Sequence, residues 1–258
     1  MEEASVAAAR RRPPENVEAF ECLLRGIDHH RTRGVTDENA REAVAWFSKA
    51  IEADPNYAAA YAWRVCAAGW LPDFDIDAGE RDIRRALELD PCDPEANRIL
   101  GVIELKKGNI DQAKMLSLRA MEMNPSDAYM RARSAAVMTY AGEPLRSLSL
   151  VDEAEALDPL LPVWCVEERG VALYALDRYQ EALEAFGRLI FQSCRSRLYG
   201  AAALIALGRP REARRLAEEA VAINASLTTT RFMIDECYRD SERRSTLRER
   251  LEKAGLPK

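Results

Sequence analysis

A period of 34 residues runs through the chain and limits the folds open to it. The dipeptides Asp90-Pro91, Asn124-Pro125 and Asp158-Pro159 follow one another at this spacing. An alanine lies five residues before each of these prolines, and Gly108 and Gly142 are again 34 residues apart. Chance seldom places several small or turn-forming residues in one register, so the chain is built from internal repeats.

One repeat unit is predicted to be a hairpin of two helices. From Pro94 to Lys107 the apolar residues recur mostly at spacings of three and four, which is the pattern of an amphipathic helix. Gly108 and Asn109 predict a turn, and residues 110–123 form a second amphipathic helix. Asn124-Pro125 closes the unit because the residue before a proline is pushed away from the α region. A single hairpin cannot bury its apolar face, so neighbouring hairpins must stack.

This unit resembles the tetratricopeptide repeat (TPR). Ala43-x-x-x-Phe47 and Ala182-x-x-x-Phe186 match the family's second helix, and Leu100-Gly101 matches its Leu-Gly element. The resemblance covers about residues 17–224, roughly six repeats, although the third and fourth units lack the phenylalanine. It implies an all-α fold, an α-solenoid of about six TPR-like helical hairpins plus a C-terminal capping helix.

A narrower resemblance concerns the two ends of the chain. Residues 10–63 look like the start of TPR regions that lie C-terminal to class III nucleotidyl cyclase domains or winged-helix domains in bacterial signalling proteins. The terminus LRERLEKAGLPK is similar to the end of such cyclase-linked chains. The resemblance implies a regulatory module in bacterial signalling. The alternative is the C-terminal regulatory region of a class III adenylate or guanylate cyclase, or of a TPR-containing transcriptional regulator.

Three segments are expected along the chain. Residues 1–15 carry Arg10-Arg11-Arg12 before Pro13-Pro14 and are predicted to be a disordered linker. Residues 16–224 form the TPR solenoid, and residues 225–258 form C-terminal capping helices. The last helix is expected to begin with Ser241 as its N-cap and to stop at Gly255.

Charge, hydropathy and cysteine usage exclude several classes of partner. Lys and Arg number 37 against 43 Asp and Glu, a net charge of −6, which disfavours binding to nucleic acid. No stretch of 18 uncharged apolar residues and no secretory signal occurs, so no membrane partner is expected. The six cysteines form no C-x-x-C pair and are interpreted as free thiols, which indicates a cytoplasmic protein.

The sequence contains no motif of a known catalytic site. The phosphate-binding loop, the dinucleotide fingerprint, the nucleophile elbow and the H-E-x-x-H zinc motif are all missing. The two histidines, His29 and His30, are adjacent, so on a helix they point about 100° apart and share no face. We interpret them as a solvated helix end. No catalytic, cofactor-binding or metal-binding residue is expected, and the protein is predicted not to be an enzyme.

The resemblance also indicates where a partner binds. In TPR proteins the first helix of each hairpin lines a concave groove that holds peptides or partner elements. The residues that fall at groove positions are Arg98, Tyr129, Trp164, Glu167 and Tyr174. Aromatic residues and arginine most often anchor interfaces, so a partly apolar protein or peptide segment is the expected partner. For Trp164 and Tyr174, packing between neighbouring repeats is an equal alternative.

Overall fold

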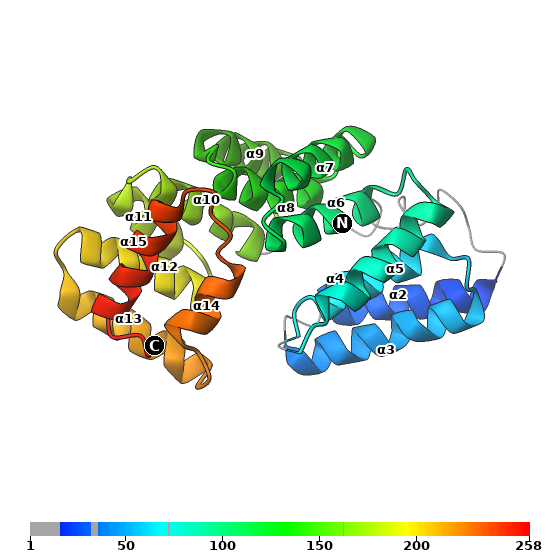
Figure 1. Ribbon diagram of the computed structural model, residues 1–258, viewed down its shortest axis with the longest axis horizontal. Coiled ribbons are helices and arrows are strands. Elements are labelled where there is room, and N and C mark those ends of the chain that lie inside the picture. Colours follow the sequence, from blue (N-terminus) through cyan, green and yellow to red (C-terminus); the bar gives the residue numbers. More distant parts are fainter. Residues whose placement is uncertain (1–15, 32–35, 72, 162) are drawn as a thin grey trace. The chain divides into compact units, whose positions relative to one another are not determined.

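The computed structural model describes residues 16–31, 36–71, 73–161 and 163–258, without the side chains of Arg31, Val163 and Trp164. Within these ranges the regular structure is helical and no strand occurs, which confirms the predicted all-α class (Figure 1). The predicted linker, residues 1–15, lies outside the described residues. Among those residues no helix has both the length and the apolar character needed to cross a bilayer.

The helices follow one another in pairs, as the 34-residue period predicts. In the first half of the chain they are α2 (Val17–Arg31), α3 (Asp37–Ala53), α4 (Ala58–Ala68), α5 (Ile76–Leu89), α6 (Pro94–Lys106) and α7 (Ile110–Met123). In the second half they are α8 (Ala128–Tyr140), α9 (Pro144–Leu157), α10 (Val163–Ala175), α11 (Tyr179–Gly187), α12 (Cys194–Ala206) and α13 (Pro210–Ile223), followed by α14 (Thr229–Asp235) and α15 (Ser241–Lys253).

The chain divides into two compact units, each with its own hydrophobic core. Unit 1 comprises the described residues up to Glu104 together with Met115–Ser126. Unit 2 comprises Leu105–Lys114 and Asp127–Lys258. The division falls inside the third hairpin, where the 34-residue spacing is most regular, and the repeat pattern contains no sign of it.

The recurring glycines end the first helix of their hairpins. Gly108, Gly142 and Gly208 have φ angles of 84°, 87° and 73°, which a residue with a side chain adopts only with strain. A β-carbon at any of these three positions would meet no atom within 4 Å, so backbone conformation alone selects glycine there. The fifth repeat has Asp177 at the corresponding turn, with a φ of 61°.

The A-x-x-x-F element brings the two helices of a hairpin close together. In the first hairpin the Phe47 ring lies directly against Gly26, and in the fifth the Phe186 ring lies against Gly170. A β-carbon on either glycine would overlap the phenylalanine ring. In both hairpins the two helices therefore approach most closely where the glycine faces the phenylalanine ring.

Acidic residues begin and end the helices. Asp54, Asp90 and Asp158 each precede a proline, and each has extended backbone, with φ between −140° and −143°. At the C-terminus the expected N-cap is wrong by one residue. Asp240, not Ser241, accepts hydrogen bonds from the amides of Glu242 and Arg243, because its side chain lies ahead of the first turn of α15.

Candidate functional site

The site is built on α8, α10 and α12, the first helices of three consecutive hairpins in unit 2. The neighbouring helices pack on one another, and α15 packs on α12. We call the surface formed by α8, α10 and α12 the first-helix face of unit 2. The connection between α14 and α15, residues 236–240, is not helical, and it lies against this face. We call it the connecting segment.

Contacts far apart in sequence hold the connecting segment and its neighbour Asp235 in place. The Asp235 carboxylate accepts a hydrogen bond from Lys106 Nζ at 2.7 Å, and the Arg239 guanidinium pairs with Asp111. The Arg239 amide donates to the Tyr140 carbonyl at 2.9 Å. That carbonyl lies in the last turn of α8, where it has no partner within its own helix. The segment thus binds through main-chain and side-chain groups alike.

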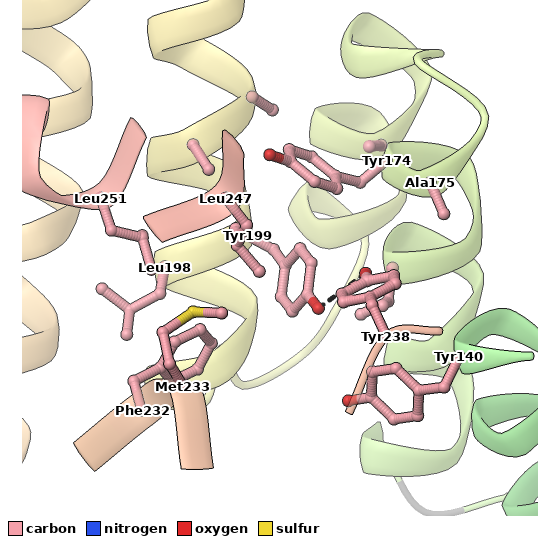
Figure 2. Close-up of a cluster of buried hydrophobic side chains, with 14 of the residues drawn as sticks. Tyr140, Tyr174, Ala175, Leu198, Tyr199, Phe232, Met233, Tyr238, Leu247 and Leu251 are labelled. Atoms are coloured by element: carbon pink, nitrogen blue, oxygen red, sulfur yellow. Dashed lines mark hydrogen bonds between the residues drawn. The ribbon is translucent and has the colours of Figure 1, made fainter. Parts of the chain in front are cut away.

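Glu236 is the centre of the site. Its side chain is only 1% exposed. One carboxylate oxygen accepts from Arg195 Nε at 3.2 Å, and the other accepts from the hydroxyls of Tyr140, at 2.8 Å, and Tyr199. The Tyr199 hydroxyl also contacts the Tyr238 hydroxyl at 2.8 Å, as Figure 2 shows. Three side chains, one from α8 and two from α12, thus donate hydrogen bonds to one buried carboxylate.

Arg195 links this carboxylate to a second one. Its Nη1 donates to Glu168 on α10 at 2.7 Å, while Nη2 donates to the Tyr140 hydroxyl at 3.0 Å. Burial raises the pKa of Tyr140 and of Tyr199 well above the usual range, and Glu236 raises both further, although Arg195 opposes the change. Both phenols are therefore neutral hydrogen-bond donors near neutral pH. The arrangement binds and orients a carboxylate, and it holds no activated nucleophile.

An apolar layer surrounds the polar groups. Figure 2 shows Phe232 and Met233 of α14 and Leu247 and Leu251 of α15 beside Leu198 of α12. Each of these five side chains is at most 9% exposed. Because water is largely excluded, the charge-assisted hydrogen bonds at Glu236 are stronger than they would be on an exposed surface.

The predicted groove residues of α10 lie beside this site. Glu167 is 5% exposed and accepts a hydrogen bond from the Ser193 hydroxyl at 2.6 Å. Tyr174 is 1% exposed, and its hydroxyl accepts from Arg250 of α15 at 3.0 Å. Trp164 belongs to α10, but its side chain is outside the described set. Glu167 and Tyr174 are therefore covered by the chain itself in this conformation.

The other two predicted groove residues are not members of this cluster. Arg98 of α6 is 2% exposed and pairs with Glu95 one helical turn earlier. Tyr129 of α8 is partly exposed and packs against a small buried cluster that includes Ala132 and Cys165. Because Arg98 is buried in an ion pair, its truncation would disturb the fold of unit 1, whereas the groove hypothesis expects an effect on binding alone.

The central residues of the site were not found from the sequence. Arg195 and Glu236 match no repeat position, and Glu236 lies 96 residues from its partner Tyr140. One signal was available, since Tyr140 precedes Tyr174 by the repeat period of 34 residues. That spacing places both tyrosines at the same position of successive first helices.

The comparisons with known proteins concern the fold. No protein-family model and no curated protein matches the sequence. A TPR protein from Parabacteroides merdae is similar over 96% of this chain and 89% of its own, with a TM-score of 0.60 and 14% identity. PilF of Pseudomonas aeruginosa is similar over 81% of this chain and 93% of its own, with a TM-score of 0.54 and 16% identity.

A third solved structure extends the likeness to a protein complex. A chain of the APC/C hetero-tetramer Cut9–Hcn1 is similar over 86% of this chain and 46% of its own, with a TM-score of 0.62 and 15% identity. Identities this low establish the fold and leave the partner open. The chain has the TPR fold, an all-α stack of helical hairpins, as its repeat period predicts.

Proposed function

We propose that the protein is a non-catalytic protein-interaction module that binds a segment of a partner protein on its first helices. One observation carries the proposal. The first-helix face of unit 2 already holds a non-helical polypeptide segment, the chain's own residues 236–240, through a buried carboxylate and a main-chain amide. The fold itself occurs in an assembly of two different proteins, Cut9 and Hcn1.

The bound segment indicates the chemistry of the partner. It presents a glutamate to one arginine and two tyrosine hydroxyls, and a tyrosine two residues later to the same hydroxyl cluster. A partner with a glutamate followed two positions later by an aromatic residue would satisfy the same groups after replacing the connecting segment. Arginine and tyrosine are favourable anchors for such an interface because they combine area with directed hydrogen bonds.

A peptide experiment tests this recognition directly. A labelled peptide of residues 234–240, with Cys237 replaced by serine, is titrated into the wild-type chain and into the Glu236→Ala variant. In the wild type the linked segment occupies the face at high effective concentration, so we expect little binding. The Glu236→Ala variant should bind the peptide at least about tenfold more tightly.

Two controls separate specific recognition of the glutamate from nonspecific binding of the peptide. A peptide with glutamine in place of its glutamate should lose most of the binding, and so should a protein that carries both Glu236→Ala and Arg195→Met. Hydrogen exchange must show that α8, α10 and α12 remain protected in each variant. If the folded Glu236→Ala variant binds the glutamate and glutamine peptides equally, the proposed recognition is wrong.

Cellular context is also part of the proposal. All six cysteines lie in the described residues and are free thiols, which supports a reducing compartment such as the cytoplasm. The likeness of both chain ends to cyclase-linked TPR regions supports a regulatory role in bacterial signalling, either as a separate module or as part of a cyclase or transcriptional regulator. This idea predicts a cyclase or winged-helix domain encoded upstream in the same reading frame or in a neighbouring gene, and the genomic sequence tests it.

A further inference from the structure

Three first helices of unit 1 bring a cysteine, a histidine and an arginine together. Cys66 lies on α4, between His30 of α2 and Arg98 of α6. Its sulfur is 3.4 Å from His30 Nε2 and 3.4 Å from Arg98 Nη2. His30 lies near the end of α2 and is partly exposed, as the sequence interpretation expects, but its imidazole also contacts a buried thiol, which that interpretation did not include.

The surrounding residues hold these three groups in position. Glu95 accepts from Arg98 Nε at 2.9 Å and pairs with its Nη2 as well, so the guanidinium is fixed. The Trp63 ring meets the His30 ring edge to face, with 6.0 Å between the ring centroids. Cys66 is 6% exposed and Arg98 is 2% exposed. The sulfur is thus shielded from large molecules, and a small neutral molecule reaches it when the unit opens locally.

The charges around Cys66 favour its thiolate form. Burial by itself raises the pKa of the thiol, and Glu95 raises it further. The charges of His30 and Arg98 and the hydrogen bond from His30 outweigh both, and they lower the pKa from 9.0 to about 7. Near neutral pH a large fraction of Cys66 is therefore the nucleophilic thiolate.

We propose that Cys66 is an oxidation site that small peroxides convert to a sulfenic acid. The Cys66 thiolate attacks one oxygen of hydrogen peroxide, so that an S–O bond forms as the O–O bond breaks. Sulfur is oxidised by two electrons and the peroxide is reduced. In the ion-pair form the thiol proton resides on His30 Nε2, and it passes to the departing hydroxide, which leaves as water. Arg98 stabilises the negative charge throughout.

The unit contains a matched control for burial. Cys22 of α2 is 8% exposed, close to the exposure of Cys66, and among the described residues no histidine, lysine or arginine hydrogen-bonds to its sulfur. Cys92 is exposed and controls for access. If access alone decided reactivity, Cys92 would react fastest and the two buried thiols would react equally slowly.

The test uses the full chain with limiting hydrogen peroxide, dimedone as the trap for sulfenic acid, and mass spectrometry of each cysteine peptide. At pH 7 we expect Cys66 to be labelled about tenfold faster than Cys22. Its rate should fall as the pH drops below about 7, the pKa of the thiol, because the thiolate is then protonated. Replacing His30 with glutamine should slow labelling several-fold and move the pH midpoint upward.

A second variant keeps the result decisive if His30→Gln loses its structure. Arg98→Lys retains a positive charge without the fixed guanidinium fork and should give an intermediate rate. Circular dichroism confirms folding of each variant, and Cys22 serves as the internal reference. The proposal would be overturned if Cys66 and Cys22 were labelled equally fast in the folded wild type. It would also be overturned if neither substitution changed the labelling rate of Cys66.

Discussion

At the scale of single residues, aspartate side chains cap many of the helix ends. Asp54, Asp90 and Asp158 each accept a hydrogen bond from the amide two residues later, at 2.9–3.0 Å, just after a helix ends. Asp75 and Asp127 accept amide hydrogen bonds just before one begins. A short carboxylate side chain that reaches nearby amides is suited to both positions.

Asp93 is the cap that should make stability depend on pH. Its Oδ1 accepts from the Ala96 amide at 2.7 Å, ahead of α6. Burial raises its pKa to about 6, and Glu95 and Asp90 add to the rise, although the amide hydrogen bonds oppose it. A raised folded-state pKa stabilises the fold below the unfolded value of 3.8, and this stability is lost as the pH rises to about 6.

Replacing Asp93 with asparagine should remove this loss. The amide side chain keeps the cap without the charge, so at pH 7 we expect the free energy of unfolding to rise by about 1–2 kcal/mol. Near pH 3.5 the variant and the wild type should be almost equal. Urea unfolding at both pH values measures the difference, with Asp75→Asn as the control at an exposed cap. A gain at pH 3.5 as large as that at pH 7 would contradict the assignment.

At the scale of helices, each hairpin depends on how closely its two members approach. The glycine that faces a phenylalanine ring allows this approach in the first and fifth hairpins. In the second hairpin Gly79 of α5 instead faces the ring of Phe74, at 2.6 Å from where a β-carbon would lie. A glycine that faces an aromatic ring thus recurs in three hairpins. It lies on the first helix in the first and fifth hairpins and on the second helix in the second hairpin.

Replacing Gly170 with alanine should force α10 and α11 apart. Overpacking against the Phe186 ring is expected to cost about 2 kcal/mol, more than alanine gains from its higher helix propensity. Combining the change with Phe186→Leu should recover part of the loss, and a double-mutant cycle on thermal unfolding measures this coupling. Gly187→Ala, where a β-carbon meets nothing within 4 Å, should be neutral or slightly stabilising. Purely additive effects would show that the contact is not close.

At the scale of the whole chain, stability should be local to each unit. Proteins built from stacked repeats distribute their stability over neighbouring elements, and here each unit has its own core. In unit 2 the last two helices depend on Glu236 and on Arg244, whose guanidinium donates to the carbonyls of Met233 and Glu236 at 2.7 and 2.9 Å. Loss of these contacts should therefore affect α14 and α15 first.

Replacing Glu236 with alanine tests this locality. Removing a buried partner of Arg195 should lower the free energy of unfolding of unit 2 by about 2–4 kcal/mol. Hydrogen exchange should become faster in α14 and α15, while α2–α5 of unit 1 exchange as before. Glu212→Ala breaks an exposed ion pair with Arg209 and should leave the stability almost unchanged, because solvent screens that pair. Faster exchange in both units would contradict the local distribution of stability.

The sequence by itself determined the all-α class, the helical hairpins and their turns, through the repeat period together with the local pattern inside each unit. Glycine φ angles, residues that precede proline and apolar spacing act within a few neighbouring residues, so they can be read from the sequence. This is why the turns at Gly108 and Gly142 were predictable. The N-cap of α15 was misplaced by one residue because Asp240 and Ser241 both have suitable side chains.

Only the tertiary structure decided which side chains meet on the faces of the stack. Arg239 pairs with Asp111 across 128 positions, and Glu236 binds Tyr140 across 96. Cys66 meets His30 and Arg98 from helices 36 and 32 positions away. The repeat spacing predicts that the hairpins stack. Which side chains then face one another depends on the rotation between neighbouring hairpins and on where the C-terminal segment packs on the first helices. Neither is encoded in a local pattern, because both follow from the packing of all the repeats together.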